Sequence, residues 1–138
     1  MLRMGYMPSD FHPLLLVLGD ADELRRFADV LARFSERGGP LSLTENGVHG
    51  PDTTVWLRES TGGPEGTLGL WVSCGTTRQL DWILSKALAS EFAGEVLELA
   101  RSGQAAGSVM LECGHAGEIK VKVSMGEWED HFLADGAR

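Results

Sequence analysis

The sequence predicts an α+β protein in which a mainly antiparallel sheet carries two helices on one face. Two observations predict this class. Short apolar runs are separated by segments rich in glycine, proline and aspartate, as in strands joined by tight connections. In addition, two stretches open with a helix-capping pattern and continue with apolar residues at helical spacing. The expected element order is β-α-β-β-β-α-β-β.

The first helix is expected over residues 20–37. Asp20 stands at the N-cap position and Glu23 three residues later, which is the spacing of a capping box. The apolar residues that follow at helical spacing are Leu24, Phe27, Ala28, Leu31 and Phe34. Glycines at 38 and 39 and a proline at 40 predict the end of this helix.

The strands are expected at apolar or alternating segments between turn signals. The first is a short apolar run rather than an alternation, which predicts a buried strand, and the last two alternate apolar with polar residues. The predicted strands cover residues 12–18, 41–45, 53–59, 67–73, 109–113 and 119–125.

The second helix is expected to begin at Thr76, with Gln79 completing a second capping box. Its predicted buried stripe consists of Leu80, Ile83, Leu84, Ala87, Leu88 and Phe92. Residues 14–27 also align without a gap on residues 70–83, and both segments follow the order strand, glycine, capping box, helix. This internal repeat predicts two βαββ halves.

The length and composition predict one globular domain. The chain has 138 residues, of which 43% are hydrophobic and 23% charged. Residues 1–11 are expected to form a loose arm, and residues 134–138 a fraying tail. No run approaches the roughly 20 apolar residues that span a bilayer, and the start of the chain lacks a secretory signal pattern. We therefore expect a soluble, cytoplasmic protein that does not enter a membrane.

The charge balance argues against a nucleic-acid partner. Twelve Lys and Arg oppose twenty Asp and Glu, giving a formal net charge of −8, and no basic cluster exceeds two adjacent residues. Binding to a phosphate backbone depends on clustered cations, so nucleic acid is not expected as a partner.

The two cysteines raise two candidate chemistries. Cys113 and His115, with Cys74 as a further ligand, would supply zinc-ligand atoms, but the chain has no zinc-site spacing and no fourth ligand. Cys74 just before the second predicted helix would suit a nucleophile, with His49, His115 or His131 as its base. The simpler interpretation is that both cysteines are free thiols that pack as small hydrophobic residues. We expect no metal and no cofactor.

A small anion could bind at the start of the second predicted helix. Backbone amides, two hydroxyl groups and a guanidinium meet there, in the segment Gly75, Thr76, Thr77 and Arg78. The alternative is an ordinary N-cap, because no phosphate-binding glycine motif is present.

Aromatic residues supply candidates for a protein interface. Strand alternation places Trp56, Arg58 and Trp71 on one face of the sheet, opposite the aliphatic face of Val55, Leu57, Leu70 and Val72. Tryptophan is enriched at interface hot spots, although a loop or terminal segment could equally cover this face. Near the C-terminus, an aromatic residue and two acids form a second candidate: Trp128, Glu129 and Asp130.

These observations favour a small acidic protein-interaction module without catalysis of its own. An immunity-like or adaptor-like partner of a basic protein fits, and so does a homodimer. The alternative is a ligand-binding domain or enzyme with a pocket near the start of the second helix. The sequence leaves open whether the protein is an enzyme.

Overall fold

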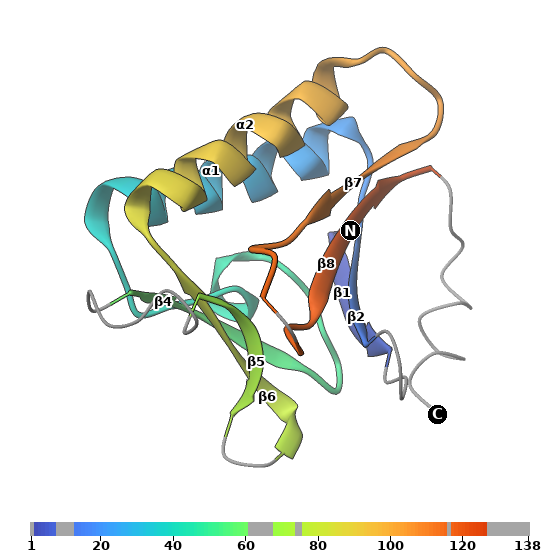
Figure 1. Ribbon diagram of the computed structural model, residues 1–138. Helices are drawn as coiled ribbons and strands as arrows, with labels where there is room; N and C mark the ends of the chain where they lie inside the picture. The colour runs from blue at the N-terminus through green and yellow to red at the C-terminus, as the bar shows by residue number, and fades with distance from the viewer. Residues whose placement is uncertain (1, 8–12, 61–67, 74–75, 116, 127–138) are drawn as a thin grey trace.

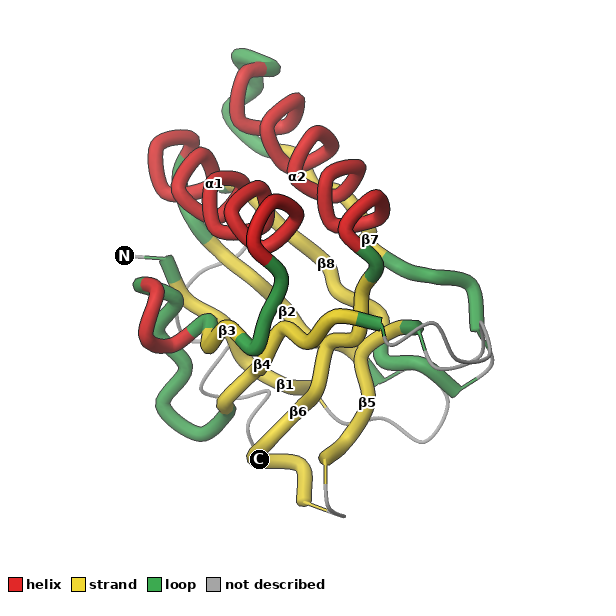
Figure 2. The backbone as a smooth tube through the Cα atoms, turned by 90° about the vertical axis from the view of Figure 1, so that its left-hand side faces the viewer, coloured by secondary structure: helices red, strands yellow, loops and turns green. Residues whose placement is uncertain are grey.

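The computed structural model describes residues 2–7, 13–60, 68–73, 76–115 and 117–126, with only the backbone for residues 76–78. Its two long helices lie side by side in one layer above the strands (Figures 1 and 2). The elements in chain order are β1 (Arg3–Met7), β2 (Leu14–Leu18), α1 (Ala21–Arg37), β3 (Leu41–Ser42), η1 (Thr44–Asn46), β4 (Thr54–Glu59), β5 (Gly69–Ser73), β6 (Thr76–Leu84), α2 (Lys86–Arg101), β7 (Gly107–Leu111) and β8 (Lys120–Met125).

The strands form two four-stranded sheets. One has the order β1-β2-β8-β7 and the other β3-β4-β6-β5, so we call them sheet A and sheet B. The antiparallel pairs are β1–β2, β3–β4, β5–β6 and β7–β8. Each sheet is joined at its centre by one parallel pair, β2 with β8 and β4 with β6. The predicted α+β class and the mainly antiparallel pairing are confirmed, but the strands divide between two sheets rather than forming one.

The order β-β-α-β-β occurs twice along the chain, apart from the short 3-10 helix η1. The first half gives β1 and β2 to sheet A and β3 and β4 to sheet B, while the second half gives β5 and β6 to sheet B and β7 and β8 to sheet A. Each sheet therefore combines a hairpin from each half, and neither half forms either sheet alone.

Both helices bury an apolar face in one core shared with the two sheets. The predicted capping box of α1 is present: the Glu23 amide donates to the Asp20 side chain (2.8 Å), and the Asp20 amide donates to Glu23 Oε1 (3.0 Å). The most deeply buried large side chains of the helices and strands include Phe27, Phe34, Leu15, Leu57, Leu80 and Trp82. Neither described helix has the length and apolar character that crossing a membrane requires.

Residues 76–84 form strand β6, so the prediction that the second helix begins at Thr76 is wrong. Leu80, Trp82 and Leu84 are buried while Asp81 and Ile83 are half-buried, which is the two-residue period of a strand. The predicted stripe fits a helix equally well by spacing alone, and pairing with both β4 and β5 decides in favour of the strand. Leu84 is fully buried, as the sequence predicts, but from a strand.

Helix α2 begins at Lys86, after strand β6, rather than at Thr76. Its N-cap is Ser85, whose hydroxyl oxygen accepts from the Leu88 amide at 3.1 Å. The gapless internal overlay therefore fails in its second part, because it lays the start of α1 on strand β6.

Two further segments differ from the prediction. Residues 3–7 form β1, paired with β2, where a loose arm was expected. Only Leu41–Ser42 of the predicted strand 41–45 is extended, and the 3-10 helix follows at once. The predicted fraying tail, residues 134–138, lies outside the described residues.

Candidate functional site

The outer face of sheet B carries a row of three half-buried side chains across three strands. The register sets Trp56 of β4 opposite Asp81 of β6, and Asp81 opposite Trp71 of β5. We call Trp56, Asp81 and Trp71 the tryptophan row. Their strand neighbours Val55, Leu57 and Leu70 are fully buried on the other face.

Arg58 lies over the Trp56 end of the tryptophan row and pairs with the carboxylate of Asp81 in that row. Its Nε donates to Asp81 Oδ1 at 2.9 Å, and its guanidinium carbon lies 5.7 Å from the centre of the Trp56 ring. This arrangement combines a salt bridge with a cation–π contact. The charges of Arg58 and Asp81 therefore largely neutralise each other within the protein.

Trp71, at the other end of the row, packs against the connection between β7 and β8. Its ring lies 3.7 Å from the position that a Cβ atom would take at Gly117. A Cβ atom at Gly69 would lie 3.3 Å from Trp71 Nε1. The same position would lie 2.8 Å from Glu118 Oε2 in the connection between β7 and β8. The Nε1 atom is buried and has no hydrogen-bond acceptor among the described residues. Trp71 is therefore partly covered by the protein's own loop.

Val72 does not share the buried face to which alternation assigns it. Its side chain is 40% exposed, and the register of β5 with β6 shifts between Val72 and Ser73. The expected pattern holds through Leu70 and fails where this irregularity ends the strand.

The connection between β7 and β8 is organised around the buried carboxylate of Glu118. The amides of Cys113 and His115 donate to this carboxylate at 3.0 Å, and the amide of Gly114 donates to it as well. Three consecutive N–H groups converging on one anion form a backbone nest, and positive φ angles at Gly114 and Gly117 shape the loop. The segment Cys113, Gly114 and His115, which suggested zinc ligands, supplies the backbone amides of this nest.

The thiol of Cys113 is free and poorly suited to act as a nucleophile. Burial raises the pKa of the Cys113 thiol to about 12, and the negative charge of Glu118 adds to the rise. The group therefore stays protonated near neutral pH, whereas a reactive cysteine needs a thiolate. Cys74 lies outside the described residues. Within the described part of the chain, no three metal-binding side chains gather.

The predicted anion site loses its structural basis. Thr76, Thr77 and Arg78 belong to strand β6, so no helix begins there to direct its amides at an anion. Gly75 lies outside the described residues, as do Trp128, Glu129 and Asp130 of the second interface candidate.

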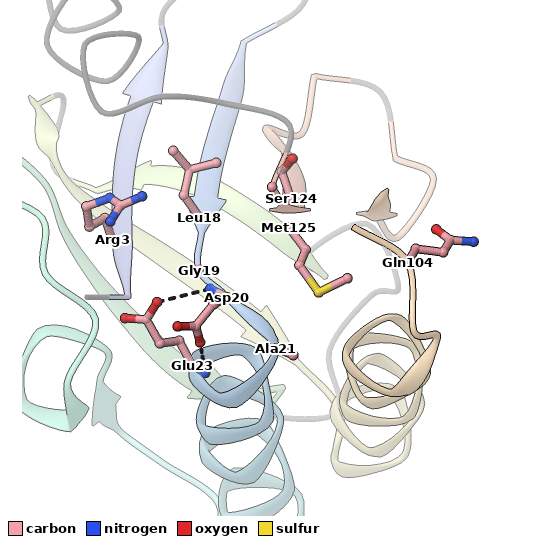
Figure 3. A pocket seen from close by; sticks show the side chains of 10 residues that line it. Arg3, Leu18, Gly19, Asp20, Ala21, Glu23, Gln104, Ser124 and Met125 are labelled. Carbon is pink, nitrogen blue, oxygen red and sulfur yellow. Dashed lines mark hydrogen bonds between the residues drawn. The ribbon is translucent and has the colours of Figure 1, made fainter. Parts of the chain in front are cut away.

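A pocket of about 350 Å³ lies at the start of α1, not at the second helix where the ligand-binding alternative expects one. Arg3 of β1 and Met125 of β8 flank it, and Asp20 and Glu23 of the capping box form its floor (Figure 3). Burial alone would raise the pKa of Glu23, but hydrogen bonding, including that from the Asp20 amide, and the charge of Arg3 lower it. Because two carboxylates line this pocket and already accept from the amides of Asp20 and Glu23, it disfavours an anion.

An exposed row of like charges on α2 was not among the candidates from the sequence. Glu91, Glu95 and Glu98 follow at spacings of four and three residues, and all three side chains are exposed. We call them the acidic row. Partial burial and the charges of Glu91 and Glu98 raise the pKa of Glu95. None of the three forms an ion pair with another described residue.

The exposed face of α1 is different, because its acids are interspersed with arginines. Asp22 pairs with Arg25 at 3.2 Å, and the exposed residues of the helix include Arg26, Arg33 and Arg37. The uncompensated negative charge of the helical layer is therefore concentrated on α2. The Glu-x-x-x-Glu-x-x-Glu spacing in the predicted helical segment could have indicated this row.

The fold and the surface define an α+β protein in which both halves of the chain contribute strands to each sheet and helix α2 carries an exposed acidic row. Comparison with known protein families, with curated proteins and with solved structures finds no match to this chain.

Proposed function

We propose that this protein is an acidic, cytoplasmic protein-interaction module that has no catalysis of its own and binds a basic protein. The observation that carries the proposal is the acidic row, whose three exposed carboxylates have no cation partner among the described residues. An immunity-like or adaptor-like protein that faces a cationic effector fits this surface.

The acidic row has an energetic cost in the isolated protein. Like charges three or four residues apart on a helix destabilise it by about 0.2–0.5 kcal/mol per pair. Lysine or arginine side chains of a partner would remove this repulsion on binding. The formal net charge of −8 would add long-range attraction, which accelerates association with a cationic protein at low ionic strength.

The same charge argues for a different partner rather than a second copy. Two molecules with a net charge of −8 repel each other, most strongly where the two acidic rows would approach. Trp56 and Arg58 remain candidates for a further contact, because both side chains are only half-buried. Trp71 is held by the β7–β8 connection, which supports a role in the fold.

Removing the acidic row should weaken binding to the partner. The variant Glu91→Gln/Glu95→Gln/Glu98→Gln is compared with Asp22→Asn/Asp29→Asn/Glu36→Gln, which removes three exposed acids from α1 and so changes the net charge equally. Proteins retained from an extract of the source organism by the wild type are purified and titrated against both variants. We expect the α2 variant to lower affinity at least about fivefold more than the α1 variant, a difference of about 1 kcal/mol.

The affinity of the wild type should also fall as salt is added, because salt screens exposed charges. Equal affinities for the two variants would show that only net charge matters. A partner that is itself acidic, or binding that does not change with salt, would contradict the proposal.

A further inference from the structure

Three of the four sheet edges are protected by the protein itself. On β1, the amide of Met4 donates to the His49 carbonyl oxygen (2.8 Å), and the His49 amide donates to the Leu2 carbonyl oxygen (2.9 Å). On β5, the Leu70 carbonyl oxygen accepts from the Ile119 amide at 2.9 Å. Strand β3 consists of only two residues. Natural sheets commonly protect their edges by such coverage or shortening.

The fourth edge, strand β7, has no such protection within the described residues. Its five residues include no charge and no proline, and they form no backbone hydrogen bond outside the pair with β8. Ser108 and Met110 are exposed, and Met110, at 43%, is more exposed than Val72, the other large hydrophobic residue classed as exposed among the described residues. A strand edge of this kind is a template for pairing with another strand.

The register identifies which groups of β7 face outward. The Lys120 amide donates to the Pro13 carbonyl oxygen, and the Gly19 amide donates to the Ser124 carbonyl oxygen, so alternate residues of β8 direct their backbone groups toward β2. The intervening residues of β8 face β7, where they pair with Gly107, Val109 and Leu111. Ser108 and Met110 therefore direct their N–H and C=O groups away from the sheet.

Helix α2 packs on one face of β7, not on its open edge, and brings the acidic row to that side of sheet A. A Cβ atom at Gly107 would lie 2.9 Å from Leu99 Cδ1, so Leu99 packs over the start of β7. Glu95 precedes Leu99 by one helical turn, and Glu91 precedes Glu95 by another, on the same side of the helix. Figures 1 and 2 show β7 running beneath α2 at the margin of sheet A.

We propose that β7 accepts an extended, basic segment of a partner protein as an additional strand of sheet A. The segment would pair with the outward N–H and C=O groups of Ser108 and Met110. Side chains on one face of an added strand point toward the covering helix, so alternate lysines or arginines would meet Glu91 and Glu95. The inference rests on the proposed function and locates the partner's segment.

A charge argument selects this occupant over the β7 strand of a second copy. The sequence Gly-Ser-Val-Met-Leu carries no cation, and pairing two copies along this edge would bring together two acidic rows. A basic segment gains both the backbone hydrogen bonds and the ion pairs.

The probe for this site is a seven-residue peptide of alternating lysine and valine, with blocked ends, titrated at low salt. We expect binding, with no binding of the matching glutamate–valine peptide. Met110→Pro removes an outward amide and leaves the bonds to β8 in place, so affinity should fall at least about tenfold. The matched control Met110→Ala retains the amide and should change affinity less than about threefold. Urea unfolding verifies that both variants are folded.

Four results would overturn the inference. They are no binding of the basic peptide, equal binding of the acidic peptide, equal loss in Met110→Pro and Met110→Ala, or sedimentation that shows a dimer abolished by Met110→Pro. If the variant of the acidic row weakens binding to the natural partner while Met110→Pro does not, the proposed function stands and the strand-addition site is ruled out. Should neither set of variants weaken the natural partner, both proposals fall.

Discussion

Replacing Trp82 by alanine should lower the free energy of unfolding by about 3–5 kcal/mol, the usual cost of truncating a large buried aromatic residue. The side chain is 2% exposed and stacks on Phe92 of α2, with ring centres 6.0 Å apart. It also lies between Leu57 and Leu70 of the two neighbouring strands. The loss of these contacts would leave a cavity where α2 meets sheet B. Urea unfolding with an unchanged slope measures the effect.

The adjacent substitution Ile83→Ala is the control for this prediction. Ile83 is half-buried on the other face of β6, beside Arg58 and Gly69, so its truncation should cost no more than about 1.5 kcal/mol. The helical interpretation of this segment makes Ile83 a core residue and leaves Trp82 outside the buried stripe. An Ile83→Ala variant as destabilised as Trp82→Ala would contradict the strand.

The variant Glu118→Ala should lose about 2–4 kcal/mol of stability, because three backbone amides lose a charged acceptor. Glu118 is 7% exposed, and its carboxylate holds the amides of Cys113, Gly114 and His115 in one loop. Water can replace only part of these bonds, since the loop is packed beside Trp71. Glu118→Gln should fall between wild type and alanine, as it retains one acceptor oxygen.

A nearby exposed acid separates this effect from the simple loss of a negative charge. The carboxylate of Glu112 reaches Lys120 at 3.4 Å, and both side chains are well exposed. Glu112→Ala should therefore change stability by less than about 0.5 kcal/mol. Were Glu118→Ala equally mild, the nest would contribute little to the stability of the loop.

Local signals were sufficient for most of the elements. The capping box at Asp20 and Glu23 and the glycines after Arg37 predict the bounds of α1 because both signals act within one helical turn. The alternation in β8 predicts a half-buried strand for the same reason. These residues would favour their structures in many surroundings.

The segment 76–84 shows where local signals were insufficient. Leu80, Ile83 and Leu84 fit a helical stripe, while Leu80, Trp82 and Leu84 fit a strand, and only the long-range pairing with β4 selects between them. The division into two sheets is equally non-local, since each sheet needs hairpins from both halves of the chain.

The candidate site was predictable only in part. Period-two alternation placed Trp56 and Trp71 on one face, but the cover that Gly117 provides for Trp71 depends on a loop more than forty positions away in the sequence. The acidic row lies within the predicted helical segment, but its lack of cation partners becomes visible only in the folded structure, and the open edge of β7 appears only once the strand order is known.

Amide hydrogen exchange along β7, with and without the lysine–valine peptide, tests most directly whether this edge and the acidic row receive a basic strand. In the free protein, the amides of Ser108 and Met110 should exchange rapidly, whereas the amide of Val109, bonded to β8, should be protected. The account predicts that the peptide protects Ser108 and Met110 and that this protection disappears in the Glu91→Gln/Glu95→Gln/Glu98→Gln variant. Slow exchange of both amides in the free protein, or no gain of protection with the peptide, would contradict it.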